Sequence, residues 1–170
     1  TVYGLRCLFV PTIEFRADGG ITVIDADSLD VSIDVTAVHS DALVRAIGER
    51  VFVVNRQGAD SIQELDAARG FATLSQRSVG AGTNPWGLAL LDDGTAWVPL
   101  YNEGALQRVD LGATGDGGFL VGAPSALPPA DDADGRAEPL DAFVFEGVLY
   151  VIVQGLDDYP SCTAAARGRL

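Results

Sequence analysis

Short apolar runs separated by glycine-containing turns recur along this chain, and this pattern limits the folds it can form more than any other feature. The segment NPWGLALLDDGTAWVPLYNEGALQRVDL, residues 84–111, contains three such runs, at 86–91, 95–100 and 105–111. The turns between them are DDG and YNEG. An Asp-Gly turn between β-prone runs is a strong hairpin signal. The segment therefore predicts three antiparallel strands.

The same arrangement occurs on both sides of this segment. RVFVVNRQGADSIQELD aligns with TAWVPLYNEGALQRVD at an offset of about 45 residues, a spacing typical of four-stranded propeller blades. The alignment places Phe52 on Trp97 and Asp66 on Asp110. A third copy, AEPLDAFVFEGVLYVIVQGLDD, has Tyr150 at the aromatic position, and CLFVPT with GGITVIDADSLD matches the second and third strands of an earlier copy. We expect these aromatic residues to fill the core between blades, in preference to forming a carbohydrate platform.

The predicted fold is an all-β partial β-propeller of about three blades of four-stranded antiparallel sheet. Its repeat units are residues 1–37, 38–80, 81–124 and 136–170, with a loop insertion at 112–138 in which FLVG is a candidate fourth strand. The chain begins and ends inside a unit. We therefore expect an incomplete ring whose missing blades come from the rest of a longer chain or from another copy.

Two segments carry more specific expectations. Residues 42–48 have helical spacing of their apolar side chains, but the aligned segments favour a strand. In residues 29–36, apolar and polar residues alternate, which predicts a half-buried outer strand with Leu29, Val31, Ile33 and Val35 on one face.

Charge and hydropathy exclude several classes of protein. The 170 residues carry a net charge of −13, whereas nucleic acids and anionic membranes require a basic surface. No apolar run approaches the roughly 20 residues that cross a bilayer, and no signal segment is evident. The chain starts with Thr1 and lacks Met, as expected of a processed protein or a piece of a longer one. All basic residues are Arg, which is typical of GC-rich bacterial genomes.

The two cysteines leave two interpretations open. Cys7 and Cys162 lie near opposite ends of the chain and would close a long loop if they formed a disulfide in an oxidising compartment. Spacing alone does not bring their Cα atoms together, so we favour two unrelated thiols. With His39 as the single histidine and no Cys-x-x-Cys, a zinc site is not expected.

The loops leading into the first strands hold the candidate binding residues. In a propeller such loops lie near the central axis on one face, which would place six polar or aromatic side chains on a shared rim: His39, Asp41, Asn84, Trp86, Glu138 and Asp141. Convergent polar groups beside an indole form pockets for small ligands or metals. Turn hydrogen bonds and packing between blades explain the same residues, and we favour that explanation.

The segment ADDADGRAEPLD, residues 130–141, resembles part of a calcium-binding loop. Asp132, Asp134 and Asp141 would supply oxygen ligands, and Gly135 the sharp turn. The first position is Ala130, the last is Asp and not Glu, and Pro139 interrupts the loop. A solvated acidic loop is therefore favoured, and no cofactor other than this Ca²⁺ is suggested. The sequence contains neither a nucleophile elbow nor a phosphate-binding glycine loop.

The repeat units resemble the YVTN-type and NHL-type β-propeller repeats of bacterial surface and periplasmic proteins. The resemblance rests on NPWGLAL at the start of a unit and on VFVVN at 51–55, and it covers nearly the whole chain. It implies an extracytoplasmic location, in the periplasm or on the cell surface, as a secreted protein or lipoprotein. Members include binding or scaffold proteins and lactonase-like hydrolases, in which Glu, Asn and Asp hold a divalent metal. Glu138, Asn84 and Asp41 have those residue types. We expect a non-enzymatic propeller that binds a small molecule or a protein, with a metal-dependent lactonase-like hydrolase as the alternative.

Overall fold

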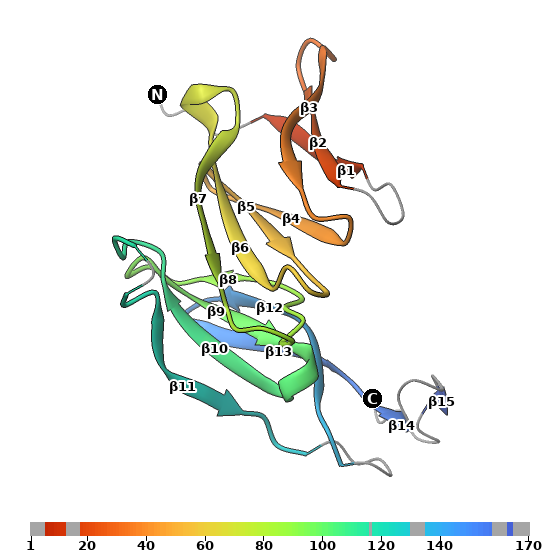
Figure 1. Cartoon of the computed structure of the whole chain (residues 1–170), viewed down its shortest axis with the longest axis vertical. Coiled ribbons are helices and arrows are strands. Elements are labelled where there is room, and N and C mark those ends of the chain that lie inside the picture. The colour runs from red at the N-terminus through yellow and green to blue at the C-terminus, as the bar shows by residue number, and fades with distance from the viewer. Residues whose placement is uncertain (1–5, 13–17, 116, 130–134, 158–162, 165–170) are drawn as a thin grey trace. The chain divides into compact units, whose positions relative to one another are not determined.

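The computed structural model describes residues 6–12, 18–115, 117–129, 135–157 and 163–164. Regular structure in these residues is β-strand apart from two short 3₁₀ turns, and the strands are antiparallel to their neighbours (Figure 1). Within them, no helix has the length and hydropathy needed to cross a bilayer. The chain divides into two compact units, residues 1–82 and 83–170.

The first unit consists of two antiparallel sheets. A three-stranded sheet contains β1 (Cys7–Thr12), β2 (Gly19–Asp25) and β3 (Val31–Val38), in that order. A four-stranded meander follows, with β4 (Ala42–Ile47), β5 (Arg50–Asn55), β6 (Ser61–Asp66) and β7 (Ala72–Ser78). The 3₁₀ turn η1 (Ala67–Arg69) connects β6 to β7. Residues 42–47 therefore form a strand despite their helical spacing, as expected from the repeat.

The second unit repeats the four-stranded meander and begins another sheet. The meander contains β8 (Ala89–Leu90), β9 (Thr95–Leu100), β10 (Ala105–Asp110) and β11 (Leu120–Ala126), with the 3₁₀ turn η2 (Tyr101–Glu103) between β9 and β10. The hairpin of β12 (Glu138–Phe145) and β13 (Val148–Gln154) comes next, followed by the short pair β14 (Leu156–Asp157) and β15 (Thr163–Ala164). The third strand expected to begin at residues 168–170 lies outside the described residues.

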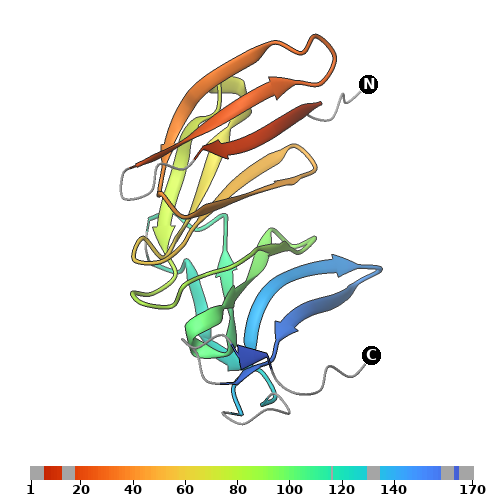
Figure 2. The same cartoon turned by 90° about the vertical axis from the view of Figure 1, so that its right-hand side faces the viewer.

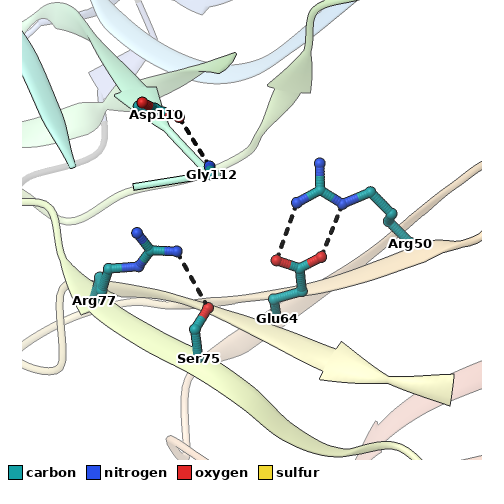
Figure 3. Close-up of polar contacts among 6 residues, drawn as sticks. All are labelled: Arg50, Glu64, Ser75, Arg77, Asp110 and Gly112. Atoms are coloured by element: carbon teal, nitrogen blue, oxygen red, sulfur yellow. Dashed lines mark hydrogen bonds and ion pairs between the residues drawn. The ribbon is translucent and has the colours of Figure 1, made fainter. Parts of the chain in front are cut away.

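The second and third strands of the two meanders are spaced almost equally along the chain. β5 and β9 have equal length and start 45 residues apart (95 − 50), and β6 and β10 start 44 apart (105 − 61). Three aspartates that end or nearly end the third strand cap the turn after it. Asp66 Oδ1 accepts a hydrogen bond from the Ala68 amide at 2.9 Å, Asp110 Oδ1 from Gly112 at 2.8 Å (Figure 3), and Asp25 Oδ1 from Ser28 at 2.8 Å. A short carboxylate satisfies turn amides that the ladder leaves unpaired, which explains its recurrence.

The core of the first unit lies between its two sheets. Ile21 and Val23 of β2 pack against Val51 and Val53 of β5 and Leu65 of β6, all buried. These residues alternate along their strands, so each sheet directs one apolar face at the other. Cys7 and Phe9 of β1 cover the edge of this cluster.

One predicted strand is interrupted. The segment 86–91 was expected to be continuous, but only Ala89 and Leu90 pair as a strand, and Pro85 forms an isolated bridge to Leu100. The Trp86 amide donates to the Pro99 carbonyl at 3.0 Å. In an antiparallel ladder the N–H and C=O of one residue point to the same neighbour, so Pro99 lacks the donor that would return this bond. The ladder opens at that point.

The half-buried character expected for residues 29–36 is wrong for most of that segment. Leu29, Val31 and Ile33 are 70%, 58% and 73% exposed. Asp34 has a φ of +51°, and the pairing of β2 with β3 shifts register between Ile21 and Val23. Between these two pairs β2 advances by two residues and β3 by four, so two extra residues of β3 bulge out of the regular ladder.

Other expectations for strands and turns are confirmed or extended. FLVG is the start of a longer fourth strand, because β11 continues through Ala126 along β10. Glu146 and Gly147 both have positive φ in the two-residue turn between β12 and β13, a combination that matches strand twist. The aromatic residues differ: Phe52 is fully buried, whereas Tyr150 is 44% exposed, so the predicted core role does not hold for Tyr150 in this chain.

Candidate functional site

Asp41, Asn84 and Glu138 occupy equivalent positions in three consecutive sheets. Each directly precedes a residue that pairs with the sixth residue of the second strand: Ala42 with Asn55, Pro85 with Leu100, and Pro139 with Val153. The Asp41 carbonyl accepts the Arg56 amide at 2.8 Å, and the Asn84 carbonyl accepts the Tyr101 amide at 3.1 Å. The three sheets thus carry a carboxylic acid, an amide and a carboxylic acid side chain at the same position.

In the second unit, the loops that hold Asn84 and Glu138 both contact η2. Thr83 and Asn84 accept backbone hydrogen bonds from Asn102 and Tyr101. On the other side, Arg136 donates to the Asn102 carbonyl at 2.8 Å. A Cβ on Gly104 would lie 2.9 Å from the Ala137 carbonyl, so this approach needs glycine. Asn84 and Glu138 are 4% and 2% exposed, so a polar amide and a carboxyl group are buried beside one short turn.

Trp86 and Asp141 complete this part of the site. The Trp86 indole stacks on Tyr101 with ring centroids 5.4 Å apart. Asp141 lies close to Gly87, where a Cβ would come within 2.6 Å of Asp141 Oδ1, so β12 packs closely on the segment after Trp86. Asn84 has a φ of +50°, a conformation that Asn tolerates better than most side chains. The structure therefore brings Asn84, Trp86, Glu138 and Asp141 onto adjacent segments of one unit.

His39 and Asp41 lie in the first unit and make turn contacts. The Asp41 amide donates to His39 Nδ1 at 3.2 Å, and the His39 amide donates to Asn55 Oδ1 at 2.8 Å. The Asp41 carboxylate pairs with the Arg56 guanidinium. These contacts are the local roles that the sequence favoured for this loop.

Residues 130–134 of the proposed calcium loop, which include Asp132 and Asp134, lie outside the described residues. In the part of the chain that is described, no group of three or more His, Cys, Asp or Glu side chains is arranged to hold a metal. Cys7 has a free, partly buried thiol, and Cys162 is outside the described residues. The structure thus leaves the calcium site and the cysteine pairing as predictions.

The first unit contains a buried polar network that was not predicted from the sequence. Asn55 donates to Gln63 Oε1 at 3.1 Å, and Gln63 Nε2 donates to Thr73 Oγ1 at 2.7 Å and to the Ala37 carbonyl at 3.1 Å. Asn55 and Gln63 are almost completely buried. The alignment places Gln63 on Gln107, also buried, and a polar residue repeated inside an alternating strand is the signal that could have revealed it.

Solved structures similar to this chain share its fold. A luciferin-regenerating enzyme matches 96% of this chain with a TM-score of 0.59 and 14% identity. A streptogramin B lyase matches 89% with a TM-score of 0.53 and 12% identity, and a protein of unknown function from Bacteroides thetaiotaomicron matches 92% with a TM-score of 0.57 and 14% identity. These are propeller-type proteins.

The chain has a β-propeller fold. It spans 58%, 49% and 38% of those three chains, respectively. No family profile and no curated protein matches its sequence. At such low identity the likeness concerns the fold alone, and the neighbours include enzymes as well as a protein of unknown function. The function of this propeller therefore has to be argued from its own residues.

Proposed function

We propose that this propeller is a non-enzymatic binding protein of the bacterial periplasm or cell surface, with its site on the loop at 84–86 and the first residues of β12, 138–141. The observation that supports it is the burial of Asn84 and Glu138 on either side of η2, next to the Trp86–Tyr101 stack. A carboxyl group next to an aromatic pair combines a polar and an apolar surface, which suits recognition of a small ligand.

The chemistry of these groups favours a small organic cation. A carboxylate attracts positive charge, and the faces of Trp and Tyr bind cations such as quaternary ammonium groups. The net charge of −13 raises the local concentration of cations around the whole molecule. An acidic protein of this kind also suits the divalent-rich surroundings of the bacterial envelope.

A metal-dependent, lactonase-like hydrolase is the second candidate, favoured by the equivalence of Asp41, Asn84 and Glu138. The fit to a divalent metal is partial. Glu138 and Asn84 supply the oxygen atoms that a hard cation prefers. The Asp41 carboxylate, in the first unit, already pairs with Arg56, and this guanidinium would oppose binding of a cation to Asp41 through like charge. This ion pair is why we place binding ahead of hydrolysis.

Calorimetry with choline, glucose and Mn²⁺ as separate probes distinguishes the two functions. The binding proposal expects choline to bind, a change in Trp86 fluorescence, and loss of both in Glu138→Gln. Glucose serves as the uncharged comparison. Binding of Mn²⁺ that is abolished by Glu138→Gln, together with hydrolysis of a simple lactone, would favour the hydrolase. Binding of none of the three probes would contradict both proposals.

A further inference from the structure

Two sheet faces in the described chain are apolar and exposed. The first, called here the N-face, is the side of β1, β2 and β3 that carries Leu8, Val10 and Val31, which are 58%, 42% and 58% exposed. The second, called here the C-face, lies on the β12–β13 hairpin and carries five large side chains, 44–59% exposed: Phe143, Phe145, Val148, Tyr150 and Ile152. Phe143 pairs with Tyr150 and Phe145 with Val148 across the hairpin, which is the blue pair of strands in Figure 2. Because side chains of paired residues point to the same side of a sheet, these four share one side of the hairpin.

The first unit shows which faces of consecutive sheets pack together. There, the side of the earlier sheet that carries Phe9 and Val23 packs on the side of the later sheet that carries Val51 and Val53. Contact between the two sheets is reinforced by the hydrogen bond between Thr36 and Thr73, 3.2 Å. We call the side that carries Phe9 the Phe9-type side and the side that carries Val51 the Val51-type side. A sheet packs its Phe9-type side on the sheet that follows it in the chain and its Val51-type side on the sheet that precedes it.

The N-face and the C-face correspond to the two sides that meet in this contact between consecutive sheets. In the second strands, Tyr150 stands at the position of Phe9 and Phe52, third from the start, so the C-face is a Phe9-type side. Leu8 and Val10 stand at the positions of Val51 and Val53, so the N-face is a Val51-type side. Leu8 pairs with Ile24 as Val51 pairs with Leu65, which fixes the equivalence independently of the strand ends. The chain thus carries an uncovered successor-type side and an uncovered predecessor-type side.

We propose that a second copy of this chain packs its N-face on the C-face of the first. Contiguous apolar faces that are exposed on a folded protein mark sites of interaction. A second copy is the occupant because the chain itself supplies a matching partner for each face, in the packing mode that its first unit already shows. The contact is heterologous, joining different surfaces of the two copies, so each copy retains one free face unless the assembly closes.

Sedimentation-velocity measurements on the 170-residue polypeptide test the proposal. The wild type should sediment at no less than twice the mass of one chain, 17.7 kDa. Val10→Asp, which places a charge on the N-face, and Tyr150→Asp, which places one on the C-face, should each sediment as a single chain. Leu74→Asp, at a 55% exposed position on β7, a strand that belongs to neither face, is the matched control and should behave as the wild type.

A mixture of the two single-face variants provides the decisive result. In a head-to-tail contact, Val10→Asp retains its C-face and Tyr150→Asp its N-face, so the mixture should form a one-to-one pair and nothing larger. A monomeric wild type would overturn the proposal and favour other sheets of a longer polypeptide as the occupant. Self-association of Val10→Asp alone would overturn it too, in favour of a contact between two C-faces. Ile152→Asp replaces Tyr150→Asp if circular dichroism shows that the latter is unfolded.

Discussion

Arg50 of β5 donates two hydrogen bonds to Glu64 of β6, from Nε to Oε1 at 2.8 Å and from Nη2 to Oε2 at 3.0 Å (Figure 3). The Arg50 guanidinium also lies over the Phe52 ring, 4.8 Å from its centroid. Glu64 is almost buried, which reduces the screening that weakens surface ion pairs. In the next sheet, Arg108 stands where Glu64 does and bonds Asp93, so the position retains a charge pair with its signs reversed.

Glu64→Ala should therefore lower the free energy of unfolding by about 1–2 kcal/mol, because a two-point bond to a charged group is lost and the guanidinium loses its partner. Urea denaturation measures the change. Arg69→Ala removes an ion pair with Asp66 at a side chain that is 78% exposed, and should change stability by less than about 0.5 kcal/mol. Equal effects of the two variants would show that burial does not strengthen the Arg50–Glu64 pair.

Gln63 connects β3, β6 and β7 through buried hydrogen bonds, and its removal should be more costly. Gln63→Ala leaves the Asn55 amide and the Ala37 carbonyl buried without this partner, so we expect a loss of about 2–3 kcal/mol in the free energy of unfolding. Gln76→Ala, which removes one bond to Ser61 at a partly buried side chain, is the comparison and should cost about 0.5–1 kcal/mol. A smaller loss for Gln63→Ala than for Gln76→Ala would contradict the role of the network.

Comparing Gly104 with Gly70 separates the free-energy cost of backbone strain from that of close packing. Both follow a 3₁₀ turn in the left-handed conformation, with φ of +59° and +64°. A Cβ on Gly70 meets nothing within 4 Å, whereas one on Gly104 would lie 2.9 Å from the Ala137 carbonyl. Gly70→Ala should cost about 1 kcal/mol from the positive φ alone, and Gly104→Ala about 1–3 kcal/mol more. Thermal denaturation compares them, and equal melting temperatures would count against close packing near Glu138.

Asp93, in the turn before β9, makes the stability of the fold depend on pH in the acid range. Hydrogen bonds from the Thr95 side chain and amide, with the nearby Arg108, hold the pKa of Asp93 below its ordinary value of 3.8. A carboxyl group with a lowered folded-state pKa stabilises the fold above its unfolded-state pKa, and this contribution disappears as the pH falls through the folded value. Asp93→Asn should therefore flatten the loss of melting temperature below about pH 4. Asp92→Asn removes a charge of the same sign from the same turn and keeps the hydrogen bonds between Asp93 and Thr95, so it is the matched control.

Cys7 should react slowly in the folded protein. Burial, followed by the negative charge of Asp25, raises the pKa of its thiol above the ordinary 9.0, so less thiolate is present at neutral pH. In a Cys162→Ala variant, alkylation of Cys7 by iodoacetamide should be slower in the native protein than in urea. In the wild type, two thiols should titrate in urea without reductant. A count of zero would establish the disulfide that the sequence left as the less favoured interpretation.

Strand positions and turn types were largely predictable because they depend on local chemistry. The Asp-Gly and Glu-Gly turns, the aspartates after each third strand and the aromatic in each second strand act over a few residues, and their repetition reinforced each assignment. The exceptions arise where one residue acts on its ladder partner. Pro99 interrupts the strand expected at 86–91, and the bulge around Asp34 takes residues of β3 out of its ladder with β2.

The sequence by itself determined that this chain forms antiparallel sheets with a period of about 45 residues, because hydrophobic alternation and turn residues are local properties. Only the tertiary structure decided which of the candidate residues are buried, which of them meet, and which faces stay uncovered. Asn84 and Glu138 lie 54 residues apart (138 − 84) and meet through η2, and Arg56 reaches Asp41 across a hairpin. Burial depends on what packs against a face, and that is set by sheet register and by distant segments.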